Sequence, residues 1–305
     1  MEIYMDMQEI QITACALCPR ACGADRTRQA GYCGGGPSVK AARAALHFWE
    51  EPCISGSRGS GAVFFSGCPL RCCFCQNHSI SAGNFGKALP IDKLSDIFLE
   101  LQEAGAHNIN LVSPMHYAPW VLRALDRVKH RLSVPVVCNS SGYERVSTLQ
   151  MFAGYIDVYL PDLKYADSER AARYSGAPDY FEAASHALPE MFRQTGGIQM
   201  DEQGILRKGM VIRHLVMPKG RFDSLAVLDW IAAHFAPEDI MVSIMSQFTP
   251  FYRSSAFPEI NRRVSTFEYN TVVDKAVSLG LQGYMQEKSA AKEEYTPLFD
   301  LTGVE

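Results

Sequence analysis

From Gly61 onward, short runs rich in β-branched and aromatic residues alternate with longer segments whose apolar residues recur at helical spacing. The sequence predicts strands at 62–66, 109–113, 134–138, 156–160, 210–217, 240–246 and 282–286. It predicts helices at 91–104, 119–130, 144–152, 222–235 and 264–279, with further helix within 168–193. Strands that alternate with helices form parallel sheets, because each helix returns the chain to the edge where the next strand begins. The pattern therefore predicts an α/β fold of six or seven βα units, as an open doubly wound sheet or as a complete or partial barrel.

The first 60 residues do not join this alternation. The Gly-rich stretches at 34–37 and 55–61 are typical of tight loops or hinges. We therefore divide the chain into an N-terminal cysteine-rich extension, residues 1–60, and a βα region, residues 61–305.

Charge and hydropathy favour a soluble, cytoplasmic protein. The net charge of −4 is a mixture of both signs, so we expect no nucleic-acid partner. The apolar runs are strand-sized and far shorter than the roughly 20 residues that cross a bilayer, so we expect no membrane segment. Residues 1–12 lack the basic and apolar regions of a secretion signal. Nine of the ten cysteines nevertheless lie within the first 75 residues, which in a cytosolic chain indicates metal or redox chemistry.

Three cysteines follow the first predicted strand with the spacing Cys68-x3-Cys72-x2-Cys75. Three thiolates can hold three corners of a 4Fe–4S cubane and leave the fourth iron open to a substrate, whereas electron-carrier motifs supply four. The alternative is a zinc knuckle with a fourth ligand from Cys73 or His78. We interpret Cys73 as a bystander.

This motif, with the aromatic Phe74 before its last cysteine, resembles the hallmark of the radical S-adenosylmethionine (radical SAM) superfamily. The resemblance implies that S-adenosylmethionine chelates the open iron. One-electron reduction, by a donor such as flavodoxin or ferredoxin, then cleaves the cofactor to methionine and a 5′-deoxyadenosyl radical that abstracts hydrogen from a substrate. The protein's part is positioning, electrostatics and exclusion of water.

Within the superfamily, the chain from about Gly61 onward is similar to the pyruvate formate-lyase activating enzymes and their uncharacterised homologues with N-terminal cysteines. This similarity implies a parallel partial barrel of the (β/α)6 TIM type, open at its side, and a protein substrate. It also implies a cofactor site formed by residues at strand ends, where barrel active sites lie. The expected cofactor-contacting residues are Phe74, Ser113, His116, Asn139, Asp162, Lys164, Arg213 and Gln247.

Some of these positions depart from the family pattern. Ser113 and His116 occupy the place where many radical SAM enzymes carry a Gly-Gly-Glu turn, and neither is a glutamate. Asn139 stands where the activating enzymes carry the aspartate of a monovalent-cation site. Arg213 and His214 are adjacent on one strand and point to opposite faces, so we expect Arg213 in the site and His214 in the core.

The extension carries a second set of cysteines, Cys15-x2-Cys18-x3-Cys22 followed by Cys33. Four thiolates could hold a structural zinc ion or an auxiliary iron–sulfur cluster, or the cysteines could carry no metal. Cys53 could replace one member, but it is better interpreted as a small buried residue.

Three functions remain open at this point. The first is a radical SAM enzyme that acts on a protein, as glycyl-radical activases do. The second is a radical SAM enzyme that acts on a small molecule or a peptide side chain. The third is a noncatalytic iron–sulfur or zinc scaffold protein.

Overall fold

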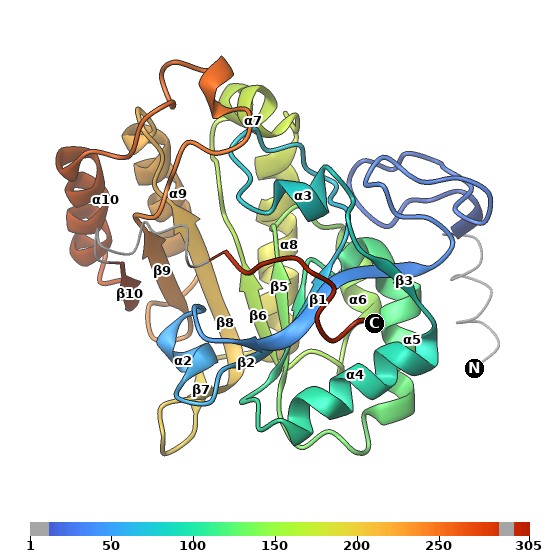
Figure 1. Cartoon of the computed structure of the whole chain (residues 1–305). Helices are drawn as coiled ribbons and strands as arrows, with labels where there is room; N and C mark the ends of the chain where they lie inside the picture. Colours follow the sequence, from blue (N-terminus) through green and yellow to red (C-terminus); the bar gives the residue numbers. More distant parts are fainter. Residues whose placement is uncertain (1–11, 287–295) are drawn as a thin grey trace.

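The computed structural model describes residues 12–286 and 296–305. Its centre is one sheet with the strand order β10-β9-β8-β6-β5-β4-β2-β1-β3, to which β7 is added beside β8 (Figure 1). The strands are β1 (Val39–His47), β2 (Ser60–Phe65), β3 (Lys87–Leu89), β4 (Ile109–Val112), β5 (Val136–Ser140), β6 (Val158–Pro161), β7 (Gln199–Met200), β8 (Leu206–Leu215), β9 (Met241–Met245) and β10 (Gly283–Met285). The strands β2, β4, β5, β6, β8, β9 and β10 run parallel. The end strands β3 and β10 do not pair with each other, so the expected α/β partial barrel, open at its side, is confirmed.

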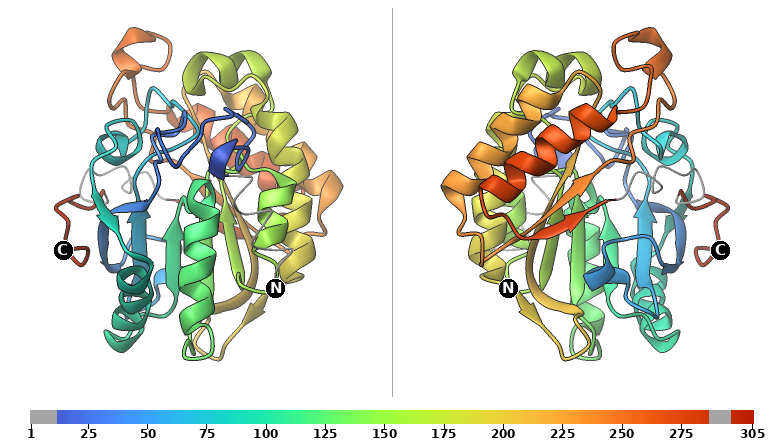
Figure 2. Two further views of the ribbon diagram at one scale, coloured as in Figure 1. Left: turned by 90° about the vertical axis from the view of Figure 1, so that its right-hand side faces the viewer. Right: turned by 90° about the vertical axis from the view of Figure 1, so that its left-hand side faces the viewer.

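Helices connect the parallel strands and follow the outer side of the curved sheet (Figure 2). The longer ones are α4 (Ile91–Glu103), α5 (Ala118–Val128), α6 (Val146–Met151), α7 (Ser168–Ser175), α8 (Tyr180–Thr195), α9 (Arg221–His234) and α10 (Thr266–Ser278). Short helical turns are α2 (Pro52–Ser55), α3 (His78–Ser81), η1 (Met115–Tyr117) and η2 (Ser254–Ala256). Each predicted helix lies within a few residues of an observed one.

Helix α4 illustrates how the sequence specifies this arrangement. It begins after Pro90, whose backbone is extended, and it is followed by Gly105 at a φ of 88°. Its residues Leu94, Phe98 and Leu101 recur at helical spacing and are buried against the sheet. Burying each of these side chains stabilises the fold by about 1.5–3 kcal/mol.

The strand register brings polar residues together at the carboxyl ends of the strands. Val112 of β4 lies beside Asn139 of β5. Asp162, just past β6, forms a parallel bridge with Arg213 of β8, which in turn lies beside Ser243 of β9. Parallel pairing therefore places these side chains at one end of the barrel.

One part of the N-terminal segment joins the sheet. Residues 39–47, which we expected to stand apart from the alternation, form β1, antiparallel to both β2 and β3. The C-terminal segment lies along the same strand, since Leu301 N–H donates to the Ala42 carbonyl and Ala44 N–H donates to the Thr302 carbonyl. The division of the chain into domains at residue 60 stays a prediction, and residues 1–11 of the expected extension lie outside the described residues.

Candidate active site

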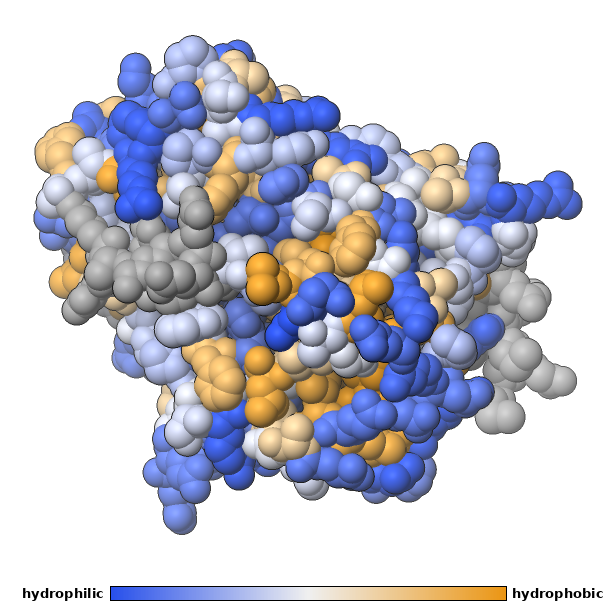
Figure 3. Space-filling view, viewed as in Figure 1, coloured by the Kyte–Doolittle hydropathy of each residue, from blue (hydrophilic) through white to orange (hydrophobic). Residues whose placement is uncertain are grey.

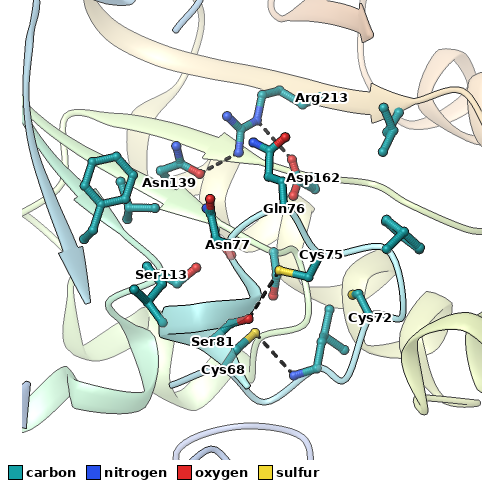
Figure 4. Close-up of a pocket in the computed structure, with 18 of the residues that line it drawn as sticks. Cys68, Cys72, Cys75, Gln76, Asn77, Ser81, Ser113, Asn139, Asp162 and Arg213 are labelled. Carbon is teal, nitrogen blue, oxygen red and sulfur yellow. Dashed lines mark hydrogen bonds and ion pairs between the residues drawn. The ribbon is translucent and has the colours of Figure 1, made fainter. Parts of the chain in front are cut away.

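A cavity of about 250 Å³ opens at the carboxyl ends of the strands. Cys68, Cys72 and Cys75 line it at one end, and Arg213 and Asn139 lie at the other (Figure 4). All the residues that we expected to contact the cofactor line this cavity, with the exception of His116: they are Phe74, Ser113, Asn139, Asp162, Lys164, Arg213 and Gln247.

The cysteine loop starts at Gly67, where β2 ends. Gly67 has a φ of 87°, and a Cβ added there would lie 2.4 Å from the carbonyl oxygen of Cys33. Only glycine therefore fits this turn. The next residue donates its N–H to the same carbonyl, at 3.0 Å, so Cys68 is held directly after the strand.

Polar groups surround the three sulfur atoms. The N–H of Leu70 donates to Cys68 Sγ at 3.4 Å. The hydroxyl of Ser175 lies 3.0 Å from Cys72 Sγ, and that of Ser81 lies 3.3 Å from Cys75 Sγ. Donors of this kind stabilise thiolates, and they also tune the potential of a cluster.

Burial acts against the free thiolates. It raises the pKa of Cys75 to about 11 and also raises the pKa values of Cys68 and Cys72. The Lys164 ammonium has the opposite effect on all three, but burial outweighs it. These cysteines therefore need a metal to become thiolates, and metal binding would release their protons.

The donor set fits a cubane better than a single ion. Two thiolates on one zinc ion lie about 3.8 Å apart, because each Zn–S bond is about 2.3 Å long. Among the residues that the structure describes, no three His, Cys, Asp or Glu side chains lie close enough to hold one ion. In a cubane each thiolate binds a different iron, so the spacing is wider. Cys73 does not line the cavity, and the exposed His78 stacks on Tyr252, so neither occupies the position of a fourth ligand.

Along the cavity, two cations alternate with two carboxylates in the order Lys164, Asp162, Arg213 and Glu50. Lys164 Nζ lies 2.5 Å from Asp162 Oδ2, and Arg213 Nε lies 3.0 Å from Asp162 Oδ1. Burial by itself would raise the pKa of Asp162, but the two cations outweigh it and lower that pKa. Burial would lower the pKa of Lys164, and the Asp162 carboxylate reverses the effect. Both groups are therefore charged in the folded protein.

The second carboxylate, Glu50, was not predicted. Its Oε2 lies 3.1 Å from Arg213 Nη1, and its Oε1 accepts hydrogen bonds from Asn139 at 3.0 Å and Asn110 at 3.3 Å. Burial raises the pKa of Glu50 in spite of Arg213. Glu50 lies between β1 and α2, in a segment with no βα pattern. The one local signal for it in the sequence is the pair of adjacent glutamates, Glu50 and Glu51, that follows Trp49.

His116, which we expected to contact the cofactor, does not line the cavity. It lies in η1, and its Nε2 is 2.9 Å from the Ser66 carbonyl, behind the cysteine loop. The 3₁₀ turn directs this side chain away from the cavity that Ser113 lines. His214 is buried as expected, 2.7 Å from the Leu163 carbonyl and 2.8 Å from Ser224 Oγ, while Arg213 faces the cavity.

Comparison with known proteins supports the iron–sulfur interpretation of the cysteine loop. Residues 55–175 match the family model of a 4Fe–4S single cluster domain. The matched segment contains Cys68, Cys72 and Cys75 as well as Ser175, which lies beside one of the sulfurs. This segment therefore resembles domains that hold a single 4Fe–4S cluster.

Longer similarities extend over most of the chain. An uncharacterized protein of Methanocaldococcus jannaschii is 29% identical over 275 residues, which cover 87% of this chain and 73% of that protein. A domain of pyruvate-formate lyase-activating enzyme from Bacteroides vulgatus aligns with 59% of this chain and 98% of its own length, at 11% identity and a TM-score of 0.43. Streptococcus suis SuiB bound to S-adenosylmethionine aligns at 15% identity and a TM-score of 0.46, over 74% of this chain and 47% of SuiB. Within the described residues, no helix combines the length and the apolar character needed to cross a membrane.

Proposed function

We propose that this chain is a radical SAM enzyme that binds a 4Fe–4S cluster through Cys68, Cys72 and Cys75. The observation that carries the proposal is that these three cysteines share one cavity with a row of paired charges, while the neighbouring Cys73 does not reach it. A cluster held by these three cysteines would leave one iron open to S-adenosylmethionine, and the chemistry it would supply is the reductive cleavage of that cofactor.

The charged residues are suited to bind the two ends of an amino-acid group. Lys164 and Arg213 offer cations to a carboxylate, and Asp162 and Glu50 offer acceptors to an ammonium. Because these four side chains hold one another, their orientation is fixed before a ligand enters. Phe74 packs on Phe248 with ring centroids 5.6 Å apart, and both rings form part of the cavity wall.

The shape of the molecule favours a large substrate. The sheet is open, and Trp49 and Pro297 line the cavity. Apolar side chains gather on the face that carries β1 and the C-terminal segment (Figure 3), where Phe48 and Leu298 are exposed. An apolar surface around a cavity is typical of a protein-binding site. We therefore propose a protein substrate, as in glycyl-radical activases.

The cluster assignment can be tested with two adjacent cysteines. The chain is reconstituted with iron and sulfide without oxygen, reduced with dithionite and supplied with S-adenosylmethionine. Cys72→Ala should abolish 5′-deoxyadenosine formation, and the control Cys73→Ala should keep most of it. Loss of product in Cys73→Ala with full activity in Cys72→Ala would refute the assignment, and no product from the unaltered chain would favour a scaffold protein.

The substrate is tested separately. The active chain is incubated with candidate partner proteins and followed by electron paramagnetic resonance. We expect a carbon-centred radical on the partner, formed in proportion to the cofactor consumed. Turnover that depends on a small molecule, with no radical or modification on any protein, would contradict a protein substrate and leave the cluster assignment intact.

A further inference from the structure

Two tight turns bring the four N-terminal cysteines together. In the first, Ala21 N–H donates to the Cys18 carbonyl and Gly23 N–H donates to the Cys15 carbonyl, both at 3.0 Å. In the second, Gly31 N–H donates to the Gly35 carbonyl at 2.9 Å, which closes a turn around Cys33. A Cβ added to Gly31 would lie 3.4 Å from Cys22 Sγ and 3.8 Å from Cys33 Sγ, so these two sulfurs face the same small space.

The N-terminal set repeats a local feature of the cluster-binding loop. In the loop, sulfurs accept hydrogen bonds from the backbone N–H two residues later, as Cys68 does from Leu70 at 3.4 Å. In the N-terminal set, Cys33 accepts such a bond from Gly35, also at 3.4 Å. Three more sulfurs accept a hydrogen bond from the backbone N–H two residues later: Cys18 from Arg20, Cys22 from Ala24, and Cys75 from Asn77. Backbone donors directed at sulfur stabilise thiolates that bind metals.

A buried arginine next to Cys33 lacks an anionic partner. Arg26 is fully buried and donates only to carbonyls, those of His116 and Gly36, and its Nε has no hydrogen-bond partner. A Cβ added to Gly35 would lie 2.3 Å from Arg26 Nη2 and 3.3 Å from Cys33 Sγ, so the guanidinium and the sulfur are neighbours. The rings of Tyr117 and Trp120, whose centroids lie 5.2 and 4.8 Å from the guanidinium carbon, attract this cation but do not neutralise its charge. A metal centre with four thiolates carries net negative charge and would compensate Arg26.

From these observations we propose that Cys15, Cys18, Cys22 and Cys33 hold a second iron–sulfur cluster. Four protein thiolates occupy all four corners of a cubane, so this cluster would have no open iron and would serve structure or electron transfer. Four thiolates would also fit a structural zinc ion, and the metal analysis below distinguishes zinc from a cluster.

The second site is attached directly to the first. The Cys33 carbonyl accepts the Cys68 N–H at 3.0 Å, and Arg20 Nε donates to the Pro69 carbonyl at 2.9 Å. Cys33 is buried beside the loop of the first site, so a change of its side chain would act on both sites. Cys22 is exposed, so it is the better residue to change.

The experiment removes the first site from the full chain. The variant in which Cys68, Cys72 and Cys75 are all alanine is reconstituted without oxygen, and its iron, sulfide and zinc are measured. We expect about four irons and four sulfides to remain per chain, and adding Cys22→Ala or Cys22→Ser should remove most of them. Adding Cys53→Ala, a buried cysteine outside both sets, should remove none. Far-ultraviolet circular dichroism shows whether each variant is folded.

Two results would overturn the second cluster: one zinc ion per chain in place of iron, or four free thiols with no metal. The proposal is independent of the proposed function. If the triple variant keeps no iron while the unaltered chain forms 5′-deoxyadenosine, only the second cluster is refuted. If the triple variant keeps its iron while the unaltered chain forms no product, only the radical SAM function is refuted.

Discussion

Glu144 should make the stability of this protein fall as pH rises. It follows the turn 139–142, which contributes Asn139, Ser140 and Ser141 to the cavity wall. Only 4% of Glu144 is exposed, Ser140 Oγ donates to its Oε1 at 2.7 Å, and its Oε2 has no hydrogen-bond partner. Burial raises the pKa of this carboxyl from 4.5 to about 8, although the bond from Ser140 acts in the opposite direction.

The magnitude follows from the two pKa values. The folded state binds the proton more tightly than the unfolded state does, so this contribution to stability is fully present below about pH 4.5. It is lost as pH rises toward about 8. At about 1.4 kcal/mol for each tenfold change in proton affinity, the whole loss is about 5 kcal/mol. Glu144→Gln removes the ionisation and keeps an oxygen that can accept from Ser140, so its stability should lack this decline.

The assay is urea unfolding of the unaltered chain and Glu144→Gln, without oxygen, between pH 5 and 9. The difference in unfolding free energy between the two cancels pH effects that they share. As pH rises across this range, we expect the unfolding free energy of the unaltered chain to fall by several kcal/mol relative to that of Glu144→Gln. The matched control is Glu103→Gln, the same substitution at an exposed position at the end of α4. If the curves for Glu144→Gln and the unaltered chain run parallel, the carboxyl is not the buried, weakly solvated group described.

Three further predictions concern the cavity. Gly67→Ala should lose cluster iron on gel filtration, because the new Cβ would clash with the Cys33 carbonyl. The control Gly105→Ala is also at positive φ but has open space around it, so it should keep its iron and lose only about 1 kcal/mol of stability. Arg213→Met leaves the buried Glu50 without its cation and Asp162 with Lys164 alone, and it should lower the unfolding free energy by about 3–5 kcal/mol in urea titrations. An unchanged midpoint would contradict the pairing. Ser175→Ala removes the hydroxyl beside Cys72 Sγ, so redox titration should give a more negative cluster potential with unchanged iron content.

The parallel part of the fold could be predicted from the sequence because each βα unit carries its own local pattern. Helix α4 and strand β8 are both specified by the spacing of their apolar residues. Strand β1 could not be predicted in the same way. Its residues, Val39–His47, pair antiparallel with a strand on each side. Such a strand does not alternate with helices, so the βα pattern does not predict it.

The residues of the candidate site also divide into those that the βα pattern predicts and those that it does not. Asp162, Lys164 and Arg213 follow or end strands, so their meeting follows from parallel register alone. Glu50 reaches the cavity from a loop whose path is set by tertiary packing, and nothing local indicates where it goes. The position of His116 was hard to predict for a related reason, because a single 3₁₀ turn sets the direction of its ring.

An open sheet has a cost that a closed barrel avoids, because its two outer strands present unpaired backbone groups to other molecules. Here those outer strands are β3 and β10, and each contains only three residues. A strand of that length gives another chain few hydrogen bonds to extend, so it is a poor template for aggregation. The barrel can therefore stay open at its side with little risk that its edges recruit neighbouring copies into a continuous sheet.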